Sequence, residues 1–125
     1  MFVLDASAML ALLLGEDGAD FVAARLDAAE ASIINVCEVM TKAVDAGGNA
    51  ERTLKLIETW GVRVRAFRDA HAIRNAELRP RTKRLGLGFG DRAALVQGDF
   101  SRLPVLTSDK DWSKLDLGIE IIQIR

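Results

Sequence analysis

Short apolar runs alternate along the chain with longer segments whose apolar residues recur at helical spacing. The short runs are typical of buried strands and cover residues 1–4, 31–34, 62–67, 104–108 and 118–124. The longer segments predict helices over residues 7–14, from 17 or 18 onward, and over 35–46, 50–60, 68–78 and 91–98. Strands that alternate with helices favour a parallel sheet covered by helices on both faces. We therefore predict a three-layer α/β/α fold with a central, mostly parallel sheet of about five strands.

Two segments differ from this simple alternation. VRVRAF (62–67) alternates charged and apolar residues, which predicts a strand with one polar face at an edge of the sheet. RPRTKRLGLGFG (79–90) contains Pro80, several glycines and basic residues, which predicts a loop. No repeat, low-complexity tract or linker divides the chain, so we expect a single domain over residues 1–125.

The bulk composition is that of an ordinary globular domain. Of the 125 residues, 50% are hydrophobic and 28% are charged, and the net charge of −1 argues against a strongly basic coat. The single Cys37 excludes an intrachain disulfide and fits a reducing compartment, so we expect the cytoplasm. No Lys or Arg precedes the opening apolar run, Asp5 interrupts it, and the rest is too short to span a bilayer. We therefore expect neither a signal peptide nor a membrane segment.

Acidic residues from distant parts of the chain fall at the ends of predicted strands or near the starts of predicted helices. Asp5 ends the first strand, and Asp109 follows the strand VLTS. Asp91 opens a helix after the glycine-rich segment. Glu38 lies one turn into the helix after ASIIN, with Asn35 three residues before it on the same face. Functional residues of doubly wound sheets gather beyond the carboxyl ends of the strands, so these side chains can converge.

A group of carboxylates in one cleft points to a divalent cation. Like charges repel one another and cannot all stay ionised unaided. Mg²⁺ and Mn²⁺ prefer carboxylate and water oxygens, whereas one His and one Cys argue against a zinc site of the usual kind. Such a cation can activate a water molecule and neutralise charge on a phosphodiester.

Each acid taken alone also has a purely structural interpretation. Asp5 and Asp91 suit helix N-caps, and Asp109 suits a turn in TSDKD. Glu38 suits a solvated helix position, although apolar neighbours surround it in the sequence. The presence of all four acids at such positions favours a shared site.

Four motifs in this order resemble one known family. VLDASA at the start, INVCEV in the second βα unit, LGFGDRAAL past the middle and VLTSDKDW near the end are similar to motifs of the PIN domain. Within that family the chain resembles the VapC-like toxin ribonucleases of type II toxin–antitoxin systems, over essentially its whole length. The resemblance implies a Mg²⁺- or Mn²⁺-dependent endoribonuclease that hydrolyses tRNA, rRNA or mRNA.

The resemblance also implies roles for particular residues and partners. The catalytic and metal-binding acids would be Asp5, Glu38, Asp91 and Asp109. The supporting polar residues would be Ser7, Asn35 and Thr107, with Asp111 as a nearby fifth acid. A VapB-like antitoxin and a homodimer are the implied protein partners. The apolar helix over residues 7–14 is either buried on several sides or a surface for such a partner.

A basic run precedes Asp91, with no acid between Leu78 and Gly90. It consists of Arg79, Arg81, Lys83 and Arg84. Its structural interpretation is a solvated loop, and its functional interpretation is contact with RNA phosphates. Arg92, directly after Asp91, either joins these contacts or pairs with a neighbouring acid.

Two other classes of function stay open on the residues alone. A phosphoryl-transfer domain with Asp5 as nucleophile typically has a second Asp two residues on, where this chain has Ser7. A non-catalytic nucleic-acid-binding or protein-binding module on the same fold would require no chemistry of the acids. Metal-dependent RNA cleavage that is lost in Asp5→Asn separates these classes from a nuclease.

The remaining chemically versatile side chains favour structural roles. His71 has no neighbouring ligand pattern, so we expect a surface or structural histidine. Cys37 is expected to be a small buried hydrophobe. Trp112 is expected to be a packing anchor, with base stacking as the alternative.

Overall fold

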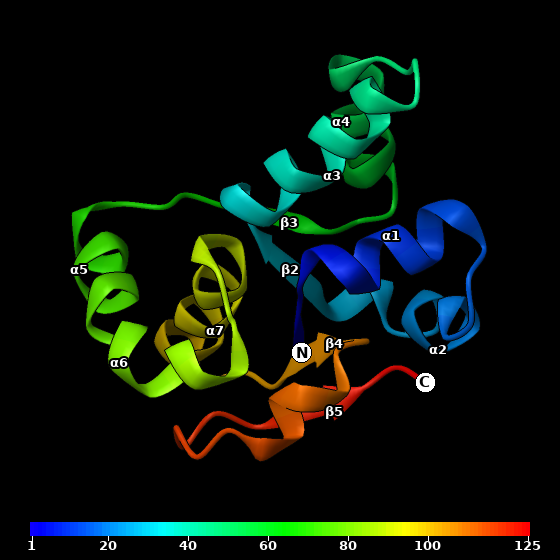
Figure 1. Ribbon diagram of the computed structural model, residues 1–125. Coiled ribbons are helices and arrows are strands. Elements are labelled where there is room, and N and C mark those ends of the chain that lie inside the picture. Colours follow the sequence, from blue (N-terminus) through cyan, green and yellow to red (C-terminus); the bar gives the residue numbers. More distant parts are fainter.

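The computed structural model describes all of residues 1–125 and contains one five-stranded sheet (Figure 1). The strands are β1 (Phe2–Leu4), β2 (Ala29–Ser32), β3 (Arg63–Arg65), β4 (Val105–Thr107) and β5 (Ile121–Gln123). Their order across the sheet is β3-β2-β1-β4-β5, and every neighbouring pair is parallel. The predicted parallel sheet of about five strands is confirmed.

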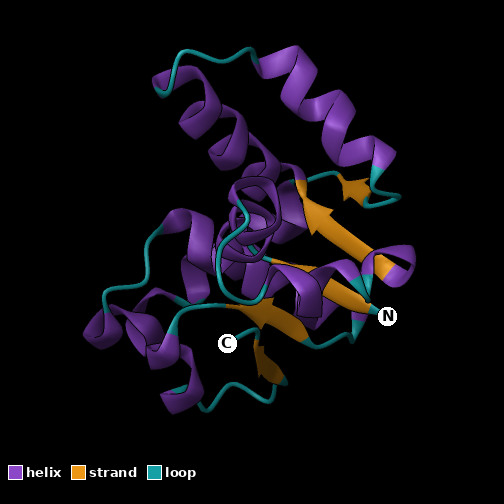
Figure 2. Ribbon diagram, turned by 90° about the vertical axis from the view of Figure 1, so that its right-hand side faces the viewer, coloured by secondary structure: helices purple, strands orange, loops and turns teal.

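Seven α-helices and three short 3-10 helices connect and cover the strands. The α-helices are α1 (Ala6–Leu14), α2 (Ala19–Ala23), α3 (Ile33–Asp45), α4 (Ala50–Thr59), α5 (Asp69–Glu77), α6 (Arg79–Thr82) and α7 (Phe89–Ser101). The 3-10 helices are η1 (Leu26–Ala28), η2 (Lys83–Leu85) and η3 (Lys110–Lys114). Helices α1 to α4 cover one face of the sheet and α5 to α7 cover the other, so the three layers are confirmed (Figures 1 and 2).

The central strand β1 supplies side chains to both halves of the core. Leu4 packs into the cluster that includes Leu106 and Ile57, whereas Val3 packs into the cluster that includes Val105 and Leu95. All of these side chains are fully buried. Each contributes about 1.5–3 kcal/mol relative to full exposure, so the core holds the end of β1 rigidly in place. None of the helices has the length and apolar character needed to cross a bilayer.

The strand predicted over residues 31–34 was wrong by two residues, because β2 ends at Ser32 and α3 begins at Ile33. The side chain of Ser32 caps α3 by accepting the Ile34 N–H at 3.2 Å, which draws the β-branched Ile33 and Ile34 into the helix. At the other end β2 includes Glu30, whose buried carboxylate accepts a 2.9 Å hydrogen bond from Gln97 Nε2. A charged residue in a buried strand is tolerable only with such a partner.

The loop predicted over residues 79–90 was also wrong. The segment forms α6 and η2, and α7 already begins at Phe89. Pro80 lies in the first turn of α6, where its missing N–H is not needed, so this proline favours rather than breaks the helix. The prediction of β3 as an edge strand with a polar face is confirmed, since Arg63 and Arg65 are exposed and Val64 is half-buried.

Candidate active site

Asp5 lies at the carboxyl end of the central strand, between β2 and β4, and it is only 4% exposed. It is also the N-cap of α1, since its Oδ1 accepts the Ala8 N–H at 2.8 Å. The structural interpretation of Asp5 as a cap is therefore confirmed, and it does not conflict with a role in a site. The cap fixes the carboxylate on the most rigid part of the sheet.

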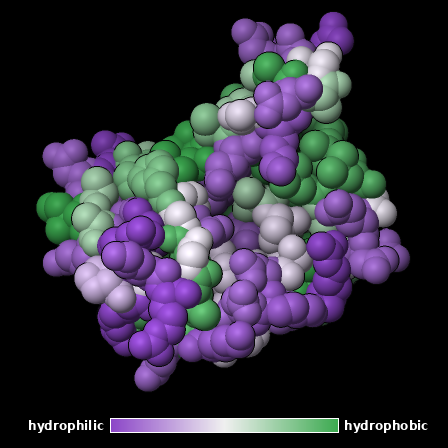
Figure 3. All heavy atoms as spheres, in the orientation of Figure 1, coloured by the Kyte–Doolittle hydropathy of each residue, from purple (hydrophilic) through white to green (hydrophobic).

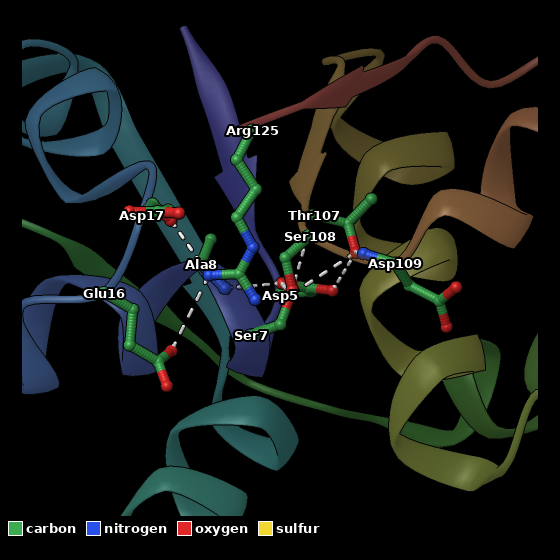
Figure 4. A network of polar contacts seen from close by, with 9 residues as sticks. All are labelled: Asp5, Ser7, Ala8, Glu16, Asp17, Thr107, Ser108, Asp109 and Arg125. Atoms are coloured by element: carbon green, nitrogen blue, oxygen red, sulfur yellow. Dashed lines mark hydrogen bonds and ion pairs between the residues drawn. The ribbon is translucent and has the colours of Figure 1, made fainter.

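Two hydroxyl groups hold the Asp5 carboxylate from either side (Figure 4). Ser7 Oγ donates to Oδ1 at 2.6 Å, and Thr107 Oγ1 donates to Oδ2 at 2.6 Å. Each hydroxyl oxygen in turn accepts a backbone N–H, Ser7 from Ser108 at 2.9 Å and Thr107 from Asp109 at 3.1 Å. These backbone donors orient both hydroxyl protons toward Asp5. Oδ2 accepts only this one bond, so it keeps an acceptor position free.

Burial raises the pKa of Asp5 to about 6, against the hydrogen bonds from Ser7, Thr107 and Ala8, which lower it. The charge of Asp91 raises it further. A buried carboxylate that ionises near neutral pH is poorly stabilised by its surroundings. A cation placed against Asp5 would therefore supply the missing compensation.

Glu38 projects from α3 and is held by Asn35 one turn before it. Asn35 Nδ2 donates to Glu38 Oε1 at 2.8 Å and to the Gly90 carbonyl oxygen at 2.9 Å, so it joins α3 to the start of α7. Partial burial raises the pKa of Glu38, and the charge of Asp91 adds to this, although the side chain still reaches solvent. Asn35 Oδ1 is buried and has no hydrogen-bond partner. The site therefore retains an unused oxygen ligand beside Glu38.

Asp91 occupies the first turn of α7, where its carboxylate accepts the Gly88 N–H at 3.1 Å. Burial raises the pKa of Asp91, and the charge of Asp109 acts in the same direction. The Gly88 N–H and the charge of Arg92 oppose this shift. Asp91 therefore lies near the helix start as predicted, but it is the third residue of α7 rather than its N-cap, because the helix begins at Phe89 and Gly88 is the N-cap.

Asp109 and Asp111 lie on the turn that follows β4. Asp109 caps η3 by accepting the Asp111 N–H at 2.9 Å. The Asp111 carboxylate instead pairs with Lys114 Nζ at 3.0 Å on the exposed surface. Asp109 is therefore linked to Asp5 through Thr107, whereas the charge of Asp111 is already compensated.

The four acids act on one another electrostatically, since the charge of Asp91 raises the pKa of both Asp5 and Glu38, and Asp109 raises that of Asp91. No three His, Cys, Asp or Glu side chains lie close enough together to form a compact metal cluster. The donor set is nevertheless one of hard oxygens, with the open position on Asp5 Oδ2 and the unpartnered Asn35 Oδ1. These donors fit Mg²⁺ or Mn²⁺.

Arg92 forms hydrogen bonds within the protein near this site. Its Nε donates to the Asn75 carbonyl oxygen at 3.1 Å and to Asn75 Oδ1 at 3.0 Å, and its Nη1 donates to the Leu87 carbonyl oxygen at 3.1 Å. The side chain thus joins α5 to the start of α7. Contact between Arg92 and RNA stays a prediction.

The basic run forms α6 and η2 rather than a loop. Arg79 donates to the Leu87 carbonyl oxygen at 3.4 Å, and Arg81 donates to the Asp116 carbonyl oxygen. Lys83 and Arg84 are exposed. Their predicted contact with RNA phosphates stays a prediction as well.

Three further side chains can now be placed. Trp112 is fully buried, so it packs in the core and cannot stack on a base. Cys37 is exposed on α3, so its predicted burial was wrong. His71 accepts the Arg68 N–H at 3.0 Å through Nδ1 and so caps α5, which confirms a structural histidine.

Gly90 is the site residue that sequence reasoning missed. Its carbonyl oxygen accepts from Asn35, and its missing side chain leaves the space that the Glu38 carboxylate occupies. A glycine directly before a candidate acid at a helix start was the available signal.

Solved structures with a similar fold include toxins and toxin–antitoxin complexes. VapBC2 from Rickettsia felis, bound to a DNA fragment from its promoter, matches with a TM-score of 0.77 and 11% identity over 98% of this chain and 97% of that one. A toxin–antitoxin complex from Klebsiella pneumoniae matches with a TM-score of 0.76 and 22% identity, over 100% of this chain and 98% of that one. VapC20 from Mycobacterium tuberculosis is described as a sarcin–ricin loop cleaving toxin. It matches with a TM-score of 0.75 and 16% identity, over 91% of this chain and 94% of that one.

Sequence comparison with curated proteins gives no match. The PIN domain family model, in contrast, matches residues 2–117, which include all four acids of the site. The order of the strands, the acids at their carboxyl ends and this match agree: the chain belongs to the PIN domain family.

Proposed function

We propose that this protein is a Mg²⁺- or Mn²⁺-dependent endoribonuclease of the VapC toxin type, inhibited by a VapB-like antitoxin. The observation that carries the proposal is the buried Asp5 carboxylate, oriented by Ser7 and Thr107 at the carboxyl end of β1. A purely structural cap would not need burial next to a second acid, Asp91, whose charge makes ionisation of Asp5 harder. A cation-binding role accounts for both features.

We assign the cation to Asp5 and Asp91, with Glu38 as a further ligand. When bound there, Mg²⁺ or Mn²⁺ lowers the pKa of a water molecule and offsets charge on the RNA phosphodiester. Ser7 and Thr107 keep the Asp5 oxygens in a fixed direction, and Asn35 does the same for Glu38. Rigid orientation of ligands is what sites of this kind require.

Asp109 has a different part in this proposal. It stands on the turn after β4, where its backbone N–H orients the Thr107 hydroxyl. Its charge raises the pKa of Asp91, and Thr107 links its backbone to Asp5, so it belongs to the same group of acids. We assign Asp109 to orienting the attacking water or to a second cation.

RNA is the substrate class that we propose, and tRNA, rRNA and mRNA are the candidates. The similarity in fold to a toxin described as cleaving the sarcin–ricin loop supports RNA. RNA and the exposed, reduced thiol of Cys37 both fit the cytoplasm.

The antitoxin partner has support from the surface of α3. An apolar cavity of about 440 Å³ next to Glu38 is lined by Ile34, Cys37, Thr41 and Phe89, among others. Leu14 and Val44 are also exposed, and Figure 3 shows apolar surface over α1 and the adjoining part of the α3–α4 hairpin. Uncovered apolar area of this kind favours a protein partner. The antitoxin and a second copy of the chain in a homodimer are the partners that we propose.

Incubation of the purified, antitoxin-free protein with total tRNA and rRNA tests the proposal. The reactions contain Mg²⁺, Mn²⁺ or EDTA, and Asp5→Asn is compared with Asp20→Asn, which removes an exposed acid on α2. We expect discrete fragments that need the metal and Asp5 but not Asp20. Equal fragments from wild type and Asp5→Asn would contradict the role of Asp5, and no fragments in any metal would instead favour a non-catalytic binding module.

A further inference from the structure

A second cavity, of about 460 Å³, lies between the β3 edge of the sheet and helices α5 and α7. It is distinct from the group of acids, and none of its lining residues is acidic. Its polar and aromatic lining consists of Arg65, Arg68, His71, Gln97, Phe100 and Ser101. This lining combines positive charge, aromatic surface and amide groups.

Two guanidinium groups give the cavity its charge. Arg68 forms no ion pair, whereas Arg65 is half-exposed and forms an ion pair with Glu30 at 3.9 Å. Burial is the main cause of the lowered pKa of His71, and the charges of Arg68 and Arg65 add to it, so both guanidinium groups lie near that ring. The charge of Arg65 is partly compensated and that of Arg68 is not, so the cavity carries net positive charge that suits an anion such as phosphate.

Gln97, one of the lining residues, is held in place by buried hydrogen bonds. Gln97 is 3% exposed, and its Nε2 donates at 2.9 Å both to Glu30 Oε1 and to Ser101 Oγ. Those two partners fix the orientation of the amide, because the reverse orientation would place Oε1 against a carboxylate. Gln97 Oε1 has no partner. A buried acceptor of this kind costs stability unless a donor from a ligand or solvent reaches it.

Aromatic rings connect this cavity to the acids. The ring of Phe89, which lines the apolar cavity beside Glu38, contacts Phe67 at a centroid distance of 5.6 Å. Phe67 contacts His71 at 5.7 Å, and His71 contacts Phe100 at 4.6 Å. Phe89 and Phe100 are 52% and 44% exposed. The series offers flat surfaces for bases along α7, starting two residues before Asp91.

We propose that this cavity binds a nucleotide of single-stranded RNA that flanks the cleaved phosphodiester. Arg65 and Arg68 bind its phosphate, and the exposed ring of Phe100 stacks on its base. Charge next to aromatic surface is the usual combination for single-stranded nucleic acid. The inference rests on the proposed nuclease function, for which it supplies a subsite beyond the acids.

Titration of a fluorescently labelled single-stranded RNA in EDTA measures this binding apart from cleavage. Arg65→Gln and Arg68→Gln are compared with Arg52→Gln, which removes the same charge from an exposed position on α4. We expect the Kd to rise five- to tenfold in each cavity variant and by less than twofold in Arg52→Gln. The slope of log K against log salt should fall by about 0.7 for each lost phosphate contact. An unchanged Kd and slope in both cavity variants would overturn the inference.

A second pair of variants tests stacking. Phe100→Leu removes an exposed ring of the series, whereas Ile73→Ala removes an exposed apolar side chain of α5 that does not line the cavity. Only Phe100→Leu should weaken RNA binding, by about three- to tenfold, in keeping with the known strength of base stacking. Loss of a dimer in sedimentation with unchanged RNA affinity would instead assign the ring to contact between copies and overturn this role.

Failure of the inference and failure of the nuclease proposal give different results. If wild type cleaves RNA in Mg²⁺ and both cavity variants cleave and bind equally well, only the subsite is overturned. If wild type does not cleave but its RNA binding depends on Arg65 and Arg68, the subsite is supported and only the nuclease proposal fails.

Discussion

Gly90 and Glu38 face each other across the contact between α3 and α7 so closely that a methyl group at position 90 would overlap the Glu38 carboxylate. Asn35 links the two, since its amide donates both to Glu38 and to the Gly90 carbonyl oxygen. The absence of a side chain at position 90 is therefore part of what positions Glu38.

The substitution Gly90→Ala should displace Glu38 and lower RNA cleavage at least tenfold. Stability should change by no more than about 1 kcal/mol, because alanine favours the helix and the displaced group is the end of a flexible side chain. Cleavage rates and urea denaturation measure the two effects. Gly88→Ala is the matched control, since a Cβ there meets open space. Equal rates for both alanine variants would contradict this account of Glu38.

The raised pKa of Asp5 predicts a loss of stability with rising pH in the absence of metal. Below the ordinary aspartate pKa of 3.8 the carboxyl is protonated in both the folded and the unfolded state, and between 3.8 and about 6 only the unfolded chain ionises. Above that range the folded protein holds a buried charge at a cost of about 3 kcal/mol, at 1.36 kcal/mol for each pKa unit. Urea denaturation in EDTA should show wild type losing stability relative to Asp5→Asn as the pH rises from about 4 to about 7. A difference in unfolding free energy between wild type and Asp5→Asn that does not vary with pH would contradict the raised pKa of Asp5.

The same carboxyl groups should govern the pH dependence of cleavage. Asp5, Glu38 and Asp91 all have raised pKa values, and a metal ligand must be deprotonated. At low Mg²⁺ the rate should rise with pH through a midpoint near the Asp5 pKa of about 6. At saturating Mg²⁺ the midpoint should move to lower pH, because the cation competes with the proton. If the midpoint of the pH–rate profile did not change with Mg²⁺ concentration, these acids would not be metal ligands.

Arg92→Ala should destabilise the protein by about 1–3 kcal/mol, because it removes the donor to the buried Asn75 Oδ1 and the shorter of the two hydrogen bonds to the Leu87 carbonyl oxygen. Arg84→Ala, at an exposed position, should change stability by less than about 0.5 kcal/mol. Thermal unfolding of the two variants measures this difference in stability. If Arg92→Ala lowered RNA affinity but left stability unchanged, Arg92 would be an RNA contact rather than a structural one.

The sequence predicted the fold well because its signals are local and repeated. The central strands β1 and β4 are short and apolar, and a helical segment lies between each strand and the next, so the pattern alone indicated a parallel sheet. The boundaries of the elements were predicted wrongly where one residue type is compatible with two kinds of secondary structure. Ile33 and Ile34 favour a strand in isolation but follow the cap Ser32, and Pro80 breaks a helix interior but suits a first turn.

The candidate site was predictable in its acids but not in its contacts. Asp5 and Asp109 could be placed at strand ends by counting residues. Nothing in the sequence indicated that Thr107 would donate to Asp5, or that Asn35 would join Glu38 to Gly90, since these contacts bridge segments 102 and 55 residues apart. The cavity at Arg65 and Gln97 was not predicted for the same reason, because its two sides come from β3 and α7.

The hydrogen bond between Thr107 and Asp5 spans 102 residues of chain, and it also has a consequence for the order of events during synthesis. β1 is synthesised well before its neighbour β4. A nascent chain that has not yet exposed residue 107 lacks the hydroxyl that orients Asp5 and the whole of the turn with Asp109. If the protein cleaves RNA as proposed, the ribosome and message that produce it are exposed to an inactive polypeptide until residues 105–109 have been synthesised.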